Sequence, residues 1–94
     1  MAKNIRLTKA NKIAINRIIA TKQLMNGYGK SAQLAKQDGD EKNYKHFNDI
    51  YNKYLDKWVT EMDLLAEMNG MTWLELVDSK NYMDMRIANR HENI

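Results

Sequence analysis

The sequence predicts an all-α protein, namely a helical hairpin with a long second helix that is closed by one or two short C-terminal helices. Three observations support this fold class. Apolar residues recur at steps of three and four over long stretches, proline is absent, and the four glycines stand only where that periodicity weakens. A chain of 94 residues, 44% of them hydrophobic, is long enough to bury one compact core. We therefore expect a single helical domain over residues 1–94.

The first predicted helix begins near Thr8. Its apolar side includes Ile18 and Met25, and its end is expected at Asn26-Gly27, because glycine readily adopts the left-handed conformation that closes a helix. Residues 30–37 are again good helix formers. They either extend the first helix through a weak point or form a short separate turn, and the sequence leaves both alternatives open.

The second predicted helix is the clearest element of the chain. The turn signal Asp38-Gly39-Asp40 precedes it, Asp40 is expected to cap its first amide groups, and Asn69-Gly70 is expected to end it. One broad face carries aromatic and apolar residues: Tyr44, Phe47, Tyr51, Tyr54, Trp58, Met62 and Leu65. We interpret this row as core-packing residues rather than as a platform for stacked bases.

A third helix is predicted from Thr72, because Thr72 and Glu75 have the spacing of a capping box. The segment Asp78-Ser79-Lys80-Asn81 is then expected to interrupt the helical pattern before a last helical segment. The acidic helical part of the chain is thus expected to cover residues 40–88, and residues 89–94 are expected to form a frayed tail.

Basic and acidic residues are distributed unevenly along the chain. The first acidic residue is Asp38, and eight basic residues precede it, so residues 1–37 carry a formal charge of +8. The other seven Lys and Arg and all twelve acids give residues 38–94 a formal charge of −5. Such an asymmetry governs long-range fields and association more than it governs a fold.

We expect the basic N-terminal half, an arm and the first helix over residues 1–37, to contact nucleic acid or a nucleic-acid-bound complex. At 100° per residue, the first helix gathers polar residues opposite its apolar side, and basic residues precede it. Lysine and arginine at such positions contact phosphates, whereas amide side chains reach sugar or base edges. The predicted interface consists of Lys3, Arg6, Lys9, Lys12, Asn16, Gln23 and Lys30.

A protein partner is the alternative. The second helix carries acidic residues away from its apolar face: Asp49, Asp56, Asp63 and Glu67. Its apolar face is broad enough to leave a strip for a partner or for a second copy in a homodimer. The small size and the composition rich in Lys, Asn, Ile and Met suit an inhibitor or adaptor, encoded by a phage or mobile element, that acts on host nucleic-acid machinery.

The segment Gly27-Tyr28-Gly29-Lys30-Ser31 ends like a phosphate-binding loop but lacks that motif's other features. The motif needs a glycine five residues before its second glycine, where this chain has Leu24, and it follows a buried strand. We interpret residues 27–31 as a flexible joint.

Residues 65–76 share a few features with the helix-turn-helix of DNA-binding proteins, chiefly a small Ala66 and the turn glycine Gly70. Asn69 stands where an apolar residue is usual, and Glu75 and Asp78 would repel phosphates. Two helices joined by a capped turn are the better interpretation.

No catalytic or metal-ligating constellation is evident. The chain has no cysteine, its two histidines, His46 and His91, are far apart, and neither Ser31 nor Ser79 has an activating context. We therefore expect no enzymatic activity, no cofactor and no metal site. No apolar run is long enough to span a bilayer and the N-terminus is polar, so we expect a cytoplasmic protein without membrane contacts.

Overall fold

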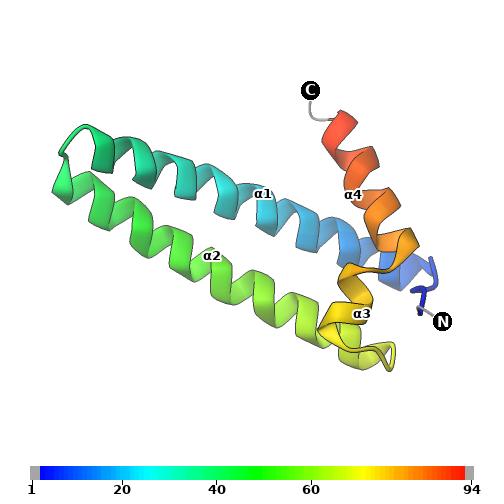
Figure 1. The fold of residues 1–94 in the computed structure, drawn as a ribbon. Helices are drawn as coiled ribbons and strands as arrows, with labels where there is room; N and C mark the ends of the chain where they lie inside the picture. Colours follow the sequence, from blue (N-terminus) through cyan, green and yellow to red (C-terminus); the bar gives the residue numbers. More distant parts are fainter. Residues whose placement is uncertain (1–2, 93–94) are drawn as a thin grey trace. The chain divides into compact units, whose positions relative to one another are not determined.

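The computed structural model describes residues 3–92, which form four helices: α1 (Lys9–Gln37), α2 (Glu41–Met68), α3 (Trp73–Val77) and α4 (Lys80–Glu92). No strand occurs in this range. α1 and α2 form a helical hairpin, and α3 and α4 follow as short helices (Figure 1). The predicted fold class is confirmed. α4 continues through Glu92, whereas residues 93–94 of the predicted tail lie outside the described residues.

Local signals in the sequence set most helix boundaries. The hydroxyl of Thr8, just before α1, accepts a hydrogen bond from the backbone N–H of Asn11 at 3.1 Å. Asp40 Oδ1, just before α2, accepts one from the backbone N–H of Asn43 at 3.1 Å. Gly70 follows α2 with a φ of 62°, a left-handed conformation that glycine adopts without strain. The predicted beginnings of both long helices and the predicted end of α2 are confirmed.

α3 begins at the predicted capping box. The backbone N–H of Glu75 donates to Thr72 Oγ1 at 3.1 Å, and the backbone N–H of Thr72 donates to Glu75 Oε1 at 2.9 Å. α3 has only five residues, and its Leu76 is fully buried. Such a short, anchored helix is a capped turn between α2 and α4 rather than a helix that could read a DNA groove.

The chain divides into two compact units. The terminal unit holds the chain up to Ile19 and from Thr60 onward, and the central unit holds Ala20–Val59. Each of the two long helices therefore contributes to both units. Most of the large buried side chains belong to the terminal unit: Ile5, Ile15, Ile18, Met62, Leu65, Leu76 and Tyr82. Among the described residues, no helix is long and apolar enough to cross a membrane.

In the central unit, α1 and α2 pack with a seven-residue repeat. Residues of α1 meet aromatic rings of α2 in three pairs: Lys22 with Trp58, Gly29 with Tyr51, and Lys36 with Tyr44. From one pair to the next, α1 advances by seven residues and α2 goes back by seven, which is the heptad spacing of a coiled coil. Beside them, Tyr28 stacks on Tyr54 with ring centroids 5.6 Å apart. The aromatic row of α2 thus packs against α1.

α1 runs without interruption through residues 27–31, so the predicted helix end at Asn26-Gly27 and the interpretation of this segment as a joint are wrong. Gly27 and Gly29 both lie inside the helix, and neither has a positive φ. The packing explains the glycine at position 29, because a Cβ atom there would stand 3.1 Å from two ring carbons of Tyr51. A tertiary contact therefore overrules the local signal for a helix end.

Candidate nucleic-acid interface

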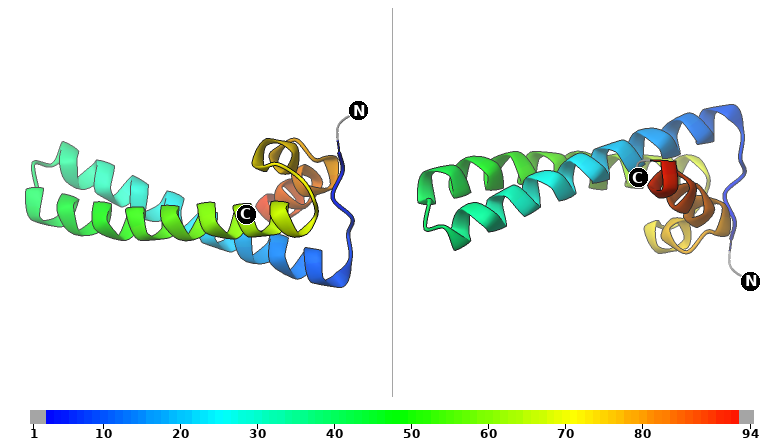
Figure 2. Two further views of the ribbon diagram at one scale, coloured as in Figure 1. Left: turned by 90° about the horizontal axis from the view of Figure 1, so that it is seen from below. Right: turned by 90° about the horizontal axis from the view of Figure 1, so that it is seen from above.

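The junction between α3 and α4 holds the N-terminal segment, residues 3–8, in place. The backbone N–H of Ile5 donates to Ser79 Oγ at 3.0 Å, and that hydroxyl donates to Asn4 Oδ1 at 2.8 Å. Asn81 Nδ2 donates to the backbone oxygen of Ile5 at 2.7 Å. Figure 2 shows this segment running beside the two short helices. Because Ile5 and Ser79 are fully buried, the neighbouring basic residues are carried on an anchored backbone.

Arg6, Lys9 and Lys12 are three exposed basic residues of the terminal unit that lie close together in the chain at the beginning of α1. Among the side chains that the structure describes, residues 3–89, none of these three forms an ion pair with a carboxylate. Lys9 and Lys12 are three residues apart in the first turn of α1, so they share one side of the helix. That turn contains no acidic residue. The positive end of the helix dipole and the two lysines therefore reinforce each other.

Lys3 is a basic residue with internal partners. Its Nζ donates to the backbone oxygen of Gly70 at 2.7 Å and lies 3.9 Å from Glu75 Oε2. The pKa of Glu75 is lowered, first by the hydrogen bond from the backbone of Thr72 and further by the charge of Lys3. Lys3 thus fastens the N-terminal segment to the connection between α2 and α3, and it shares its charge with Glu75.

The other residues of the predicted interface are exposed, but they are divided between the units. Asn16 belongs to the terminal unit, and its Oδ1 accepts a hydrogen bond from Asn89 Nδ2 at 3.2 Å. Gln23 and Lys30 belong to the central unit. The terminal unit therefore contains five of the predicted residues: Lys3, Arg6, Lys9, Lys12 and Asn16.

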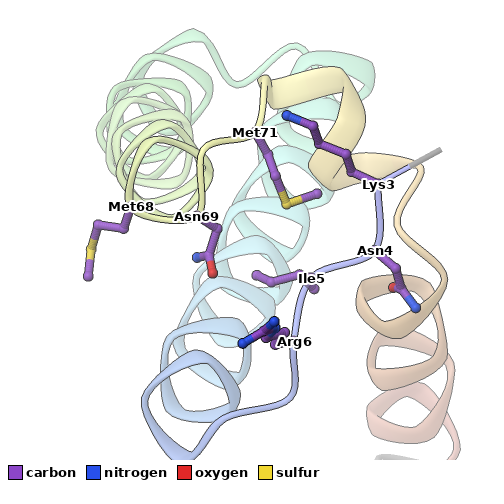
Figure 3. Close-up of a pocket in the computed structure, with 7 residues that line it drawn as sticks. All are labelled: Lys3, Asn4, Ile5, Arg6, Met68, Asn69 and Met71. Carbon is purple, nitrogen blue, oxygen red and sulfur yellow. The ribbon is translucent and has the colours of Figure 1, made fainter. Parts of the chain in front are cut away.

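A pocket of about 400 Å³ opens beside Arg6. The N-terminal segment, the end of α2 and the connection after it line this pocket with Lys3, Asn4, Ile5, Arg6, Met68, Asn69 and Met71 (Figure 3). Two of the lining residues are basic and none is acidic. In Figure 3, Lys3 and Met71 lie at one end of the pocket and Arg6 at the other. No local sequence pattern connects the methionines with the arm, because they lie far along the chain.

Asn69 is fixed in the pocket wall by Asn11. Asn11 Nδ2 donates both to Asn69 Oδ1 and to the backbone oxygen of Arg6, each at 2.9 Å. Asn69 Nδ2 donates to the backbone oxygen of Leu65 at 2.8 Å. Asn11 is buried, and buried amides that are fully paired in this way rigidify their surroundings. The backbone at Arg6 is therefore held against α1 and against the end of α2.

The acidic residues of the alternative interface are all exposed: Asp49, Asp56, Asp63 and Glu67. The first two belong to the central unit and the last two to the terminal unit. Next to Asp63 and Glu67 on α2 stand two exposed apolar residues, Leu64 at 56% and Met68 at 71% exposure. Because residues four apart lie on one side of a helix, an acidic row and an apolar row run side by side at the end of α2.

Comparison of the chain with protein-family models, with curated proteins and with solved structures gives no match. Among the described residues, no three His, Asp or Glu side chains are grouped so that they could hold a metal ion.

Proposed function

We propose that the chain is a non-enzymatic, cytoplasmic module that binds nucleic acid through Arg6, Lys9 and Lys12. The observation that supports this function is the group of three exposed cations at the beginning of α1, without a carboxylate partner among the described side chains of residues 3–89. Cations at the positive end of a helix are unfavourable unless an anion compensates them. The closely spaced phosphates of a nucleic-acid backbone supply such compensation.

The salt dependence of binding tests this function. If three side chains each neutralise one phosphate, the slope of log K against log salt concentration is expected to be about −2.7 on duplex DNA and about −2.1 on a single strand. Lys9→Ala and Lys12→Ala should each reduce the duplex slope by about 0.9. Fluorescence anisotropy with labelled DNA and RNA at several salt concentrations measures these slopes.

Lys45→Ala is the matched control, because Lys45 is an exposed lysine of α2 that lies outside the proposed interface. It should leave both the affinity and the slope unchanged. Absence of binding at low salt would contradict the proposed function, and so would a slope that survives removal of both Lys9 and Lys12.

A second candidate function is the docking of a partner protein, which the paired acidic and apolar rows at the end of α2 favour. Leu64 and Met68 are mostly exposed beside Asp63 and Glu67. The complementary surface is an amphipathic helix of the partner that carries a basic row beside an apolar row. A phage-type inhibitor or adaptor would use such a surface to act on a nucleic-acid-processing protein of its host.

Leu64→Asp tests this second function, because it replaces one of the two exposed apolar side chains of this surface with a charged one. We expect affinity capture from a nuclease-treated host lysate to retain a specific partner with wild-type protein and to lose it with Leu64→Asp. Leu34→Asp, at a leucine of similar exposure in the central unit, should retain the partner. Capture that depends on intact nucleic acid would favour the first function, and a stable oligomer without other partners in sedimentation would favour a homodimer.

A further inference from the structure

The pocket beside Arg6 is lined by apolar as well as basic residues, whereas binding a phosphate needs only the basic ones. Ile5, Met68 and Met71 contribute apolar atoms to its lining, whereas Lys3 and Arg6 contribute positive charge. Its volume of about 400 Å³ lies within the range of small-ligand pockets, roughly 300–1,000 Å³. Such a lining suits a ligand that joins a flat aromatic group to a phosphate, and a nucleotide is a ligand of that kind.

Four residues of the lining are exposed, namely Lys3, Asn4, Arg6 and Met68. Asn4 Oδ1 already accepts hydrogen bonds from Ser79 and Asn81. Arg6 forms no ion pair with any side chain of residues 3–89, whereas Lys3 is held by Gly70 and Glu75. Met68 is 71% exposed. Unpaired bases stack on guanidinium planes, and thioether sulfurs make favourable contacts with aromatic rings. The two side chains therefore offer two different contacts to one base.

We propose that this pocket receives one unpaired base of the bound nucleic acid, in contact with the Arg6 guanidinium and the Met68 thioether, and that the chain consequently prefers single strands to duplexes. This inference rests on the nucleic-acid-binding function proposed above. In a duplex, every base is stacked and paired, so placing one in the pocket costs its unstacking and unpairing. A single strand avoids most of this cost, while Lys9 and Lys12 contact its neighbouring phosphates.

Arg6→Lys is the discriminating substitution, because it keeps the charge and removes the planar group. We expect it to weaken binding of a short labelled single strand about tenfold, within the range for losing one stacking partner, and to weaken binding of a duplex of equal length far less, because lysine keeps the charge that attracts phosphate. Met68→Ala should act in the same direction, at an exposed position where the fold tolerates truncation. Fluorescence anisotropy at constant salt, with DNA and RNA strands in parallel, measures these affinities.

Lys45→Arg is the matched control, since it also exchanges one cation for another but lies outside both the pocket lining and the proposed interface. It should change single-strand and duplex binding equally little. An abasic strand keeps the sugar-phosphate backbone but has no base to place in the pocket. Wild-type protein and Arg6→Lys should therefore bind it with similar affinity. The pocket inference alone is overturned if Arg6→Lys binds the single strand like wild type, or if wild type binds duplex as tightly as single strand. Absence of binding to any nucleic acid at low salt overturns this inference and the proposed function together.

Discussion

Gly27 and Gly29 lie two residues apart in α1, but the space around their Cα atoms differs. A Cβ atom on Gly27 would have no neighbour within 4 Å, whereas one on Gly29 would stand 3.1 Å from Cδ2 and Cε2 of Tyr51. Neither glycine has a positive φ, so the backbone itself requires glycine at neither position. In the sequence, both resemble residues that end a helix. Only the ring of Tyr51, which belongs to the other long helix, makes them different.

Alanine substitutions at Gly27 and Gly29 measure how much the Tyr51 ring matters for stability. Gly27→Ala is expected to raise the free energy of unfolding by about 0.8–1 kcal/mol, because alanine is the better helix former. Gly29→Ala gains the same propensity but has to displace the Tyr51 ring, so its effect should be clearly less favourable. Urea denaturation of both variants measures the difference. Adding Tyr51→Ala should abolish the penalty specific to position 29, and equal stabilisation at the two positions would show that the ring moves without cost.

α3 is an element too short to be stable by itself, since nucleating a helix fixes several residues for few hydrogen bonds. Two features of the terminal unit compensate for this. The capping box of Thr72 and Glu75 satisfies two backbone N–H groups, and Leu76 is fully buried. The first feature is visible in the sequence because its residues are three apart. The contact of Lys3 with Glu75 is not, because it joins the arm to a distant helix.

The acid stability of α3 depends on Glu75. Because the folded chain lowers the pKa of Glu75, its stabilising contribution is fully present above the ordinary Glu pKa of about 4.3 and is lost as the pH falls through the lowered folded value. Glu75→Gln keeps a side chain suited to a capping box but does not titrate. Wild-type protein should therefore lose more stability than Glu75→Gln on acidification. Urea unfolding at a series of pH values gives both curves, and parallel curves would contradict this role.

At the scale of the whole molecule, the terminal unit joins the beginning of the described chain to the junction between α3 and α4. Asn4 and Ile5 bond with Ser79 and Asn81, which are more than seventy residues away in the sequence. The same unit includes the pocket beside Arg6. The formal charge of +8 overstates the basic surface, because Lys3 pairs with Glu75 and two further lysines, Lys22 and Lys36, lie over aromatic rings of α2. Among the other basic residues of this half, Arg6, Lys9 and Lys12 lie together at the beginning of α1, whereas Lys30 is exposed in the central unit.

The sequence by itself determined the fold class, most helix boundaries and the unequal distribution of charge. Helix caps such as Asp40 and the pair Thr72 and Glu75 act over three or four residues, so they are visible in the sequence. The formal charge of each half follows directly from its residue types. The sequence also named Arg6, Lys9 and Lys12 as candidate binding residues. Only the tertiary structure decided that α1 continues through Gly29, which cations have internal partners, and that Met68 and Met71 line a pocket beside Arg6. These properties depend on contacts between residues that are distant in the chain, and no local pattern contains them.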